Sequence, residues 1–294
     1  MRILVTGVTG FVGQRLALQL SPTDEIYVIC RNQPQGLPDF IKVILVDLND
    51  EEELAKRLKH IRPDTCVHLA WQDIPDYSFE TSFCNLKRSV ALLRLLVEEC
   101  GCRKIVAAGS CWEYGKSFGL CRESDPVSSS SYFVWAKRSL ADFGEMLAAK
   151  NGITFVWMRF FYVYGPGQRS GSIIPLLAEA LRKQERPAVK TPGNANDFIY
   201  VDDIAEALAL AVRKNVPTGI YNLGSGQSVA VWKVCESIEK AMGRQPEFAK
   251  QLQQINIQPT ANFWADMSKF NSVLGWNARI NIEEGIRRYV IGIE

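Results

Sequence analysis

Three glycines spaced three residues apart give the clearest chemical signal in the chain. Gly7, Gly10 and Gly13 form the pattern Gly-x-x-Gly-x-x-Gly close to the first residue. Because glycine has no Cβ, a turn built from it lets backbone N–H groups come close to a phosphate oxygen. The spacing therefore predicts a site for the pyrophosphate of a dinucleotide.

The residues around these glycines are expected to form a strand and a helix. Residues 2–6 are an apolar run rich in β-branched side chains, which is typical of a buried parallel strand. Phe11, Leu16 and Leu20 then recur at helical spacing. Three glycines could also serve a plain turn, but the order strand, turn, helix favours dinucleotide binding, because the helix N-terminus attracts anions. The predicted cofactor turn comprises Gly7, Thr9, Gly10, Phe11, Val12 and Gly13.

The residues after the second expected strand bear on which dinucleotide is bound. Residues 25–30 read as that strand, and Arg31 and Asn32 follow it. An acidic residue at this point would bind the ribose 2′-hydroxyl of NAD, whereas the guanidinium fork of Arg31 suits a 2′-phosphate. NADP(H) is therefore favoured and NAD(H) remains possible. The alternative is that Arg31 is a solvated side chain at a strand end.

Strands and helices alternate along most of the chain. Further strands are expected over 41–46, 65–69, 103–108, 153–160 and 219–224, and helices over 51–60, 85–100, 134–150, 173–182 and 204–214. Such alternation predicts an α/β fold, a Rossmann-type doubly wound parallel sheet with helices on both faces. The alternation loosens after residue 165, which suggests a smaller C-terminal substrate lobe. We expect the dinucleotide-binding domain to comprise 1–165 and about 197–224, and the lobe about 166–196 and 225–294.

Several polar residues come directly after expected strands. Asp47, Ser110 and Tyr162 should lie at the carboxyl edge of the sheet, where ligands bind in such folds. Asp47 and Leu48 are expected to frame the adenine, although Asp47 could equally cap the next turn. His68 is expected to be a structural histidine. Asp202 and Asp203 are expected to cap the helix that begins at residue 204.

Composition limits the classes of function. The chain has 294 residues with a net charge of +2, which gives no electrostatic reason to expect nucleic acid or an anionic membrane as partner. No signal peptide or membrane-spanning run is expected. The eight cysteines form no Cys-x-x-Cys pair, and there are two histidines, so no metal site is expected. Reduced thiols in the cytoplasm fit this pattern.

A set of motifs resembles a known family, the extended short-chain dehydrogenase/reductases, which include nucleotide-sugar epimerases, dehydratases and ketoreductases. The motifs run through most of the chain in the family's order and spacing. They are Thr6-Gly-x-x-Gly-Phe-x-Gly13, His68-Leu-Ala70, Asn85, Gly109-Ser110 with Tyr114-Gly115, Tyr164-Gly-Pro166 and Asp197-Phe-Ile-Tyr-Val-Asp-Asp203. The resemblance implies a nucleotide-diphosphate sugar as substrate. It also places Leu69, Ala70, Trp71, Asn85, Lys137, Phe160 and Val163 at the cofactor.

The resemblance further implies roles at the reacting carbon. The family's Ser/Thr at the position of Ser110 binds the reacting hydroxyl or ketone, and a Tyr-x-x-x-Lys pair supplies the proton and holds the nicotinamide ribose. Lys137 matches the lysine, but Phe133 stands four residues before it, in the tyrosine's place. Tyr132 is five residues away, and a five-residue step turns a side chain roughly 140° off the lysine's face. Tyr132 remains a candidate proton donor if the helix starts after it or a bulge corrects the register.

Other departures concern the reaction and the substrate. Family dehydratases have two acids after the Ser/Thr, where this chain has Cys111 and Trp112, so dehydration is disfavoured. No histidine follows His68, which disfavours base-catalysed epimerisation. Tyr162 and Asn196 replace an asparagine and an arginine that usually touch the substrate diphosphate. We expect Tyr162 and Asn196 to contact the substrate from these positions. Arg169 could replace the missing charge, and Trp112 could form an aromatic wall against the sugar or the base.

The sequence thus favours an NADPH-dependent reductase of an NDP-4-keto-6-deoxyhexose. An NDP-sugar 4-epimerase with tightly held NAD is the alternative. A dinucleotide-binding sensor or scaffold that lost catalysis is a third possibility, supported by Phe133. Proteins of the family suggest a homodimer in which helices 85–100 and 134–150 form a four-helix bundle.

Overall fold

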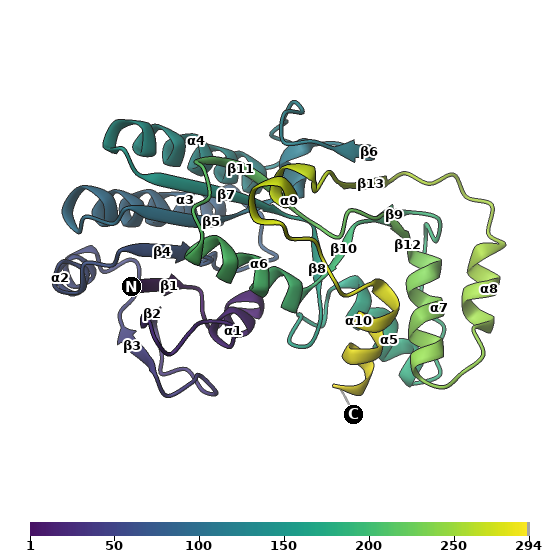
Figure 1. Cartoon of the computed structure of the whole chain (residues 1–294). Helices are drawn as coiled ribbons and strands as arrows, with labels where there is room; N and C mark the ends of the chain where they lie inside the picture. The colour runs from purple at the N-terminus through teal and green to yellow at the C-terminus, as the bar shows by residue number, and fades with distance from the viewer. Residues whose placement is uncertain (293–294) are drawn as a thin grey trace. The chain divides into compact units, whose positions relative to one another are not determined.

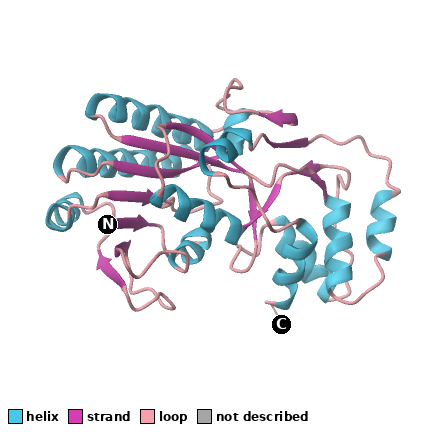
Figure 2. Cartoon of the chain, in the orientation of Figure 1, coloured by secondary structure: helices cyan, strands magenta, loops and turns pink. Residues whose placement is uncertain are grey.

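The computed structural model describes residues 1–292 and contains a parallel seven-stranded sheet (Figures 1 and 2). Its strand order is β11-β7-β5-β4-β1-β2-β3, so the chain winds outward from β1 in both directions. The bounds are β1 Arg2–Thr6, β2 Glu25–Cys30, β3 Ile41–Leu45, β4 Thr65–His68, β5 Lys104–Ser110, β7 Thr154–Phe160 and β11 Gly219–Leu223. This order is that of a dinucleotide-binding fold, and the predicted fold class is confirmed.

Helices cover both faces of this sheet. Apolar side chains of α2 (Glu51–Ile61), α3 (Phe79–Arg94) and α4 (Tyr132–Asn151) form one core with alternate sheet residues such as Leu4 and Ile105. Figure 1 shows α1 (Phe11–Ala17) and α6 (Val201–Arg213) on the opposite face. The sheet is therefore buried on both sides, which explains why its strands are continuous apolar runs.

Two helices begin earlier than the sequence predicted. Ser78 caps α3 by accepting a hydrogen bond from the Thr81 amide, and Ser131 caps α4 by accepting one from the Val134 amide. A π-helical segment, Leu95–Glu99, continues α3. Each start thus follows a serine N-cap and not the first apolar residue of the periodic pattern.

The start of α6 corrects the prediction for the two aspartates. The helix begins at Val201, so Asp202 and Asp203 lie inside its first turn and not at its cap. The Asp203 carboxylate accepts hydrogen bonds from the backbone amides of Arg279 and Ile280. Asp203 therefore ties the C-terminal segment to the start of the helix.

The chain divides into two compact units. The first comprises Met1–Gly115, Pro126–Phe160 and Ala205–Tyr221, and the second Lys116–Asp125, Phe161–Ile204 and Asn222–Glu294. In addition to the segments expected in the C-terminal lobe, the second unit contains residues 116–125, 161–165, 197–204 and 222–224. These additions contain the strands β6 (Phe118–Cys121), β8 (Tyr162–Tyr164) and β10 (Phe198–Tyr200), each of which pairs within the second unit.

The second unit has small sheets and its own apolar core. Its sheets have the orders β10-β8 and β12-β9-β13-β6. The core joins α5, α7, α8 and α10 around Tyr164 and Ile286. The bounds are β6 Phe118–Cys121, β8 Tyr162–Tyr164, α5 Ile173–Arg182, β9 Ala195–Asn196, β10 Phe198–Tyr200, β12 Val229–Ala230, α7 Val231–Ala241, α8 Glu247–Gln253, β13 Asn262–Ala265, α9 Ser268–Leu274 and α10 Ile282–Ile291.

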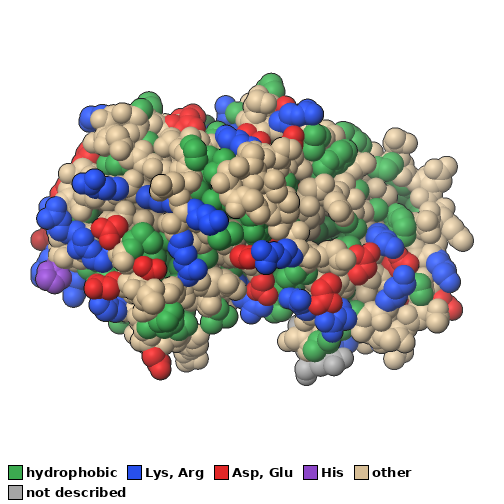
Figure 3. Space-filling model, in the orientation of Figure 1, with side chains coloured by type: hydrophobic (Ala, Val, Ile, Leu, Met, Phe, Trp, Pro, Cys, Tyr) green, Lys and Arg blue, Asp and Glu red, His purple; other side chains and the backbone are tan. Residues whose placement is uncertain are grey.

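The surface charges, the helices and the cysteines bear on metal and membrane binding. On the face drawn in Figure 3, basic and acidic side chains are interspersed. All eight cysteines are free thiols, and all but Cys84 are buried. Across residues 1–292, the structure has no helix both long and apolar enough to cross a membrane. Within the same residues no three His, Cys, Asp or Glu side chains form a group that could hold a metal ion.

Candidate functional site

The glycine turn after β1 brings three backbone segments into close contact. Gly7 adopts a left-handed φ of +76°, and a Cβ there would lie 2.6 Å from the Ala70 amide nitrogen. A Cβ at Gly13 would collide with the Gly7 carbonyl oxygen. Gly10 is the N-cap of α1 and contributes no side chain that could occupy the helix end. The turn therefore needs glycine at positions 7 and 13, and Gly10 leaves the N-terminus of α1 free of a side chain, as a phosphate site requires.

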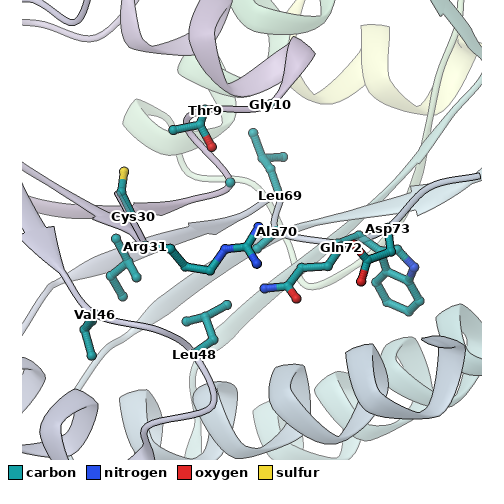
Figure 4. A pocket seen from close by; sticks show the side chains of 13 residues that line it. Thr9, Gly10, Cys30, Arg31, Val46, Leu48, Leu69, Ala70, Gln72 and Asp73 are labelled. Atoms are coloured by element: carbon teal, nitrogen blue, oxygen red, sulfur yellow. The ribbon is translucent and has the colours of Figure 1, made fainter. Parts of the chain in front are cut away.

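A cavity of about 260 Å³ opens beside this turn, within the first unit. In Figure 4 the Arg31 side chain reaches across the cavity towards Ala70, and the Gln72 side chain points into the same space. The lining residues are Gly7, Thr9, Gly10, Ile29, Cys30, Arg31, Val46, Leu48, Leu69, Ala70, Trp71, Gln72 and Asp73. Apolar walls, an amide-rich turn and one guanidinium suit the adenosine and phosphates of a dinucleotide. The residues present therefore fit such a cofactor.

Other predicted cofactor residues do not line this cavity. Phe11, Val12, Gly13, Asn32, Asp47, Asn85 and Phe160 are outside its lining. The Asp47 carboxylate accepts hydrogen bonds from the Asn49 backbone and side chain, so it stabilises the turn after β3. Asn85 accepts a hydrogen bond from the Gln72 amide and donates one to the Gln72 carbonyl oxygen. Asn85 thus holds in place a backbone segment that forms the cavity wall.

His68 lies at the end of β4 in a buried hydrogen-bond chain. Its Nδ1 is 2.8 Å from Thr6 Oγ1, and its Nε2 is 2.9 Å from Ser89 Oγ. Because the Ser89 hydroxyl donates to the Asn85 carbonyl oxygen, it accepts from His68 Nε2–H. Burial lowers the pKa of His68 to about 3, and the Lys137 charge acts in the same direction. A neutral histidine with both nitrogens bonded is a structural residue.

Ser110 is the last residue of β5 and the first of a short turn that Glu113 stabilises by hydrogen bonds. The Ser110 hydroxyl oxygen accepts a hydrogen bond from the Trp112 amide, which leaves its own proton available to donate. Glu113 is fully buried and accepts hydrogen bonds from the Ser110 amide, Trp157 Nε1 and Arg159 Nε. The Arg159–Glu113 ion pair at 2.8 Å therefore fixes the loop that carries Ser110. The Glu113 carboxylate thus has a structural role, because its oxygens accept these hydrogen bonds within the protein.

Lys137 lies on α4 with its ammonium group enclosed. Its Nζ donates to the Ala108 carbonyl oxygen at 2.9 Å and is 3.9 Å from the centre of the Trp71 ring. Burial lowers the pKa of Lys137 to about 7, although the Glu113 carboxylate acts to raise it. Since Trp71 lines the cavity and Ala108 precedes Ser110 by two residues on β5, Lys137 lies between the cofactor cavity and Ser110.

Tyr132 and Phe133 point to different surroundings. α4 begins at Tyr132 and is capped by Ser131. The helix therefore does not start after Tyr132, and it has no bulge that would turn Tyr132 onto the face of Lys137. Tyr132 is 56% exposed, and its ring packs against Phe79 at 5.5 Å between centres. Phe133 is buried, with its ring centre 5.9 Å from Lys137 Nζ. Phe133 therefore occupies the position of the family's tyrosine, one turn from the lysine.

Three aromatic rings enclose Phe133. Trp71, Tyr77 and Trp112 have ring centres 5.6, 5.2 and 5.9 Å from that of Phe133, and we call these four residues the aromatic cluster. Tyr77 also contacts Trp112 at 5.4 Å. Sequence reasoning missed Tyr77, because it lies in the irregular loop between β4 and α3, where spacing gives no signal.

The remaining predicted substrate residues belong to the second unit. Tyr162 on β8 packs against Phe198 and Phe263, and its amide donates to the Asp197 carbonyl oxygen. Asn196 on β9 pairs with Phe263, so Asn196 and Tyr162 share one neighbourhood. Arg169 donates from Nε to the Ser172 hydroxyl. Val163 lies between Tyr162 and Tyr164 on β8.

Comparison with known proteins identifies the family. The family model described as the NAD dependent epimerase/dehydratase family matches residues 3–224. A probable dTDP-glucose 4,6-dehydratase of Sinorhizobium fredii is 25% identical, over 99% of this chain and 92% of its own. The solved structure of MoeE5 in complex with UDP-glucuronic acid and NAD is 27% identical, with a TM-score of 0.82 over 100% of this chain and 99% of that one.

A second solved structure supports the fold. The UDP-glucose 4-epimerase of Thermotoga maritima, solved with UDP-glucose, has a TM-score of 0.85 at 22% identity, over 100% of this chain and 98% of that one. The family match covers most of the chain and includes the glycine turn, the Ser110 loop and Lys137. The chain is therefore a member of the NAD dependent epimerase/dehydratase family, an enzyme of the extended short-chain dehydrogenase/reductase type.

Proposed function

We propose that this chain reduces the 4-ketone of a nucleotide-diphosphate 4-keto-6-deoxyhexose. The similarity to MoeE5, solved with UDP-glucuronic acid and NAD, supports a nucleotide sugar as substrate class. The observation that carries the choice of reaction is the Ser110 turn. Cys111 and Trp112 follow the serine, so the turn offers a hydroxyl donor but no exposed acid pair for removing water.

The residues of the first unit would divide the work as follows. A bound reduced nicotinamide would supply the hydride. The Ser110 hydroxyl would donate a hydrogen bond to the ketone oxygen and polarise the carbonyl. Lys137 would bind the nicotinamide ribose from its enclosed position beside Trp71. The exposed position of Tyr132 against Phe79 does not favour it as the proton donor.

We propose NADP(H) as the preferred cofactor, because Arg31 supplies a guanidinium to the cavity (Figure 4). A 2′-phosphate takes bidentate hydrogen bonds from such a group. NADH, which lacks the 2′-phosphate, would bind more weakly.

The test is the loss of NADPH absorbance in the presence of a panel of NDP-4-keto-6-deoxy sugars. Turnover with at least one of them supports the reductase. The alternative is a 4-epimerase, which would interconvert NDP-hexoses without net consumption of NADPH and would purify with NAD bound. Tight dinucleotide binding without either activity would favour the third possibility, a sensor that lost catalysis, which Phe133 supports.

We also propose that α3 and α4 form a four-helix bundle with a second copy of the chain. Phe79, Phe83, Tyr132 and Met146 are exposed on these helices. Phe79 stacks on Phe83 at 5.6 Å, so part of this apolar surface is continuous. Light scattering is expected to give a dimer mass, and Phe83→Glu is expected to give a monomer. A wild-type monomer at micromolar concentration would contradict the bundle.

A further inference from the structure

We infer that Tyr77 donates the proton to the ketone oxygen, in place of the phenol that is missing at position 133. This inference rests on the proposed reduction, and it concerns a residue outside the family's usual Tyr-x-x-x-Lys pair. The carrying observation is the aromatic cluster, in which the Tyr77 ring contacts both Phe133 and Trp112. A phenol group therefore lies beside the position that has lost one.

The position of Tyr77 relative to the reacting groups follows from its two ring contacts. Phe133 is one helical turn from Lys137, and Trp112 is two residues after Ser110 in the same short turn. Tyr77 thus lies against both side chains that flank the predicted reaction site. Its side chain is partly exposed, so it can meet a substrate that enters from solvent.

Chemistry distinguishes Tyr77 within the cluster. Trp71, Trp112 and Phe133 carry no group that can act as a general acid, whereas Tyr77 carries a phenol, which can. The Tyr77 ring packs against the Phe133 and Trp112 rings, and these contacts hold the phenol in place beside Phe133.

Two other ionisable groups nearby, Glu113 and Lys137, are engaged in hydrogen bonds within the protein. Glu113 is buried in hydrogen bonds to the Ser110 amide, Trp157 and Arg159. Lys137 is 6% exposed and already donates to the Ala108 carbonyl oxygen. Neither group presents a proton to an entering substrate as directly as the partly exposed Tyr77.

The proposed step balances as follows. A bound reduced nicotinamide would supply a hydride, with its electron pair, to the ketone carbon, and the π pair of the C=O bond would move to oxygen. The Tyr77 O–H bond breaks as its proton forms the new O–H bond of the product alcohol. The phenolate then recovers a proton from solvent. The Ser110 hydroxyl remains a hydrogen-bond donor throughout.

The test compares single and double variants in the full-length chain. Tyr77→Phe is expected to lower kcat by about 10²- to 10⁴-fold, the usual contribution of a general acid. Tyr27→Phe on β2 is the matched control and should keep the wild-type rate, because the Tyr27 hydroxyl bonds Glu25 at an exposed site. The double variant Tyr77→Phe with Phe133→Tyr should have a kcat at least tenfold higher than Tyr77→Phe alone, because it returns a phenol to the position one helical turn from Lys137.

A binding measurement gives a readout independent of turnover. Titration calorimetry of the complex with oxidised cofactor should show two- to tenfold weaker binding of the product sugar nucleotide to Tyr77→Phe, the value of one hydrogen bond. Cofactor affinity should be unchanged.

Three outcomes would overturn the inference. A wild type that turns over while Tyr77→Phe keeps its rate within threefold would exclude Tyr77 and leave the reductase intact. A Tyr77→Phe enzyme whose lost rate is not recovered at all by Phe133→Tyr would show that a phenol in this cluster is not the missing group. A wild type that neither reduces nor binds any sugar nucleotide would remove the proposed function and the inference together.

Discussion

Phe133 and Lys137 lie one turn apart on α4, with the lysine Nζ 5.9 Å from the centre of the phenyl ring. The lysine therefore has an apolar neighbour where the family provides a phenol. Its charge is stabilised by the Trp71 ring at 3.9 Å and by one hydrogen bond to the Ala108 carbonyl oxygen. These contacts do not offset the loss of hydration, because burial lowers the pKa of Lys137 to about 7.

Lys137→Met is expected to raise the melting temperature by several degrees at pH 7 or below, because it removes a buried charge. In the wild type the unfolded lysine binds its proton up to about pH 10.5 and the folded lysine only up to about 7. Wild-type stability therefore rises between those values, and the advantage of the variant should shrink across the same window. Thermal unfolding at pH 7 and 9.5 checks this, and a pH-independent difference would contradict it.

His68 should make folding sensitive to acid. Its folded pKa is about 3 and its ordinary value 6.5, so the unfolded chain binds a proton that the folded chain excludes. The contribution of His68 to the free energy of unfolding is therefore fully present above pH 6.5, and it is lost progressively as the pH falls towards 3. Between pH 7 and 5 we expect a loss of about 2 kcal/mol relative to His68→Asn. Urea unfolding of both proteins at the two pH values measures it, and parallel pH profiles would refute it.

Glu113→Gln should strongly destabilise the Ser110 loop, because it leaves the buried Arg159 guanidinium without its counter-charge. Breaking such a pair from one side costs on the order of 3–5 kcal/mol. The double variant Glu113→Gln with Arg159→Met should recover part of that loss, since it removes both charges. Denaturant unfolding of the single and double variants provides the measurement. A single variant that loses less than 1 kcal/mol, or no recovery in the double, would show that the pair is not needed.

Local sequence patterns predicted the elements that depend on local physics. The run 25–30 coincides with β2 because its β-branched and aromatic residues favour a strand whatever surrounds it. The glycine turn was predictable because its three glycines, the strand and the helix are contiguous. The start of α4 was not, because several serines precede it and only the fold decides that Ser131 is the cap. That single choice determines where Tyr132 points.

Contacts distant in sequence could not be predicted from one chain. Glu113 and Arg159 are 46 residues apart and meet because β5 and β7 are neighbours in the sheet. Tyr77 reaches Phe133 from an irregular loop, and no periodicity marks it. The departure at Phe133 was visible in the sequence, but the residue that could compensate for it was visible only in the fold.

Arg31 should decide between the two dinucleotides, because its guanidinium lies in the cavity beside the glycine turn. Arg31→Ala is expected to weaken NADPH binding by roughly 10- to 100-fold, the value of charge-assisted hydrogen bonds to one phosphate, and to change NADH binding less than threefold. Fluorescence titration with both cofactors measures the two dissociation constants. Arg57→Ala is the matched control, since it removes the same charge from α2, where Arg57 pairs with Glu53. Equal losses for both cofactors would mean that Arg31 contacts a part they share, and no loss for either would place its side chain in solvent.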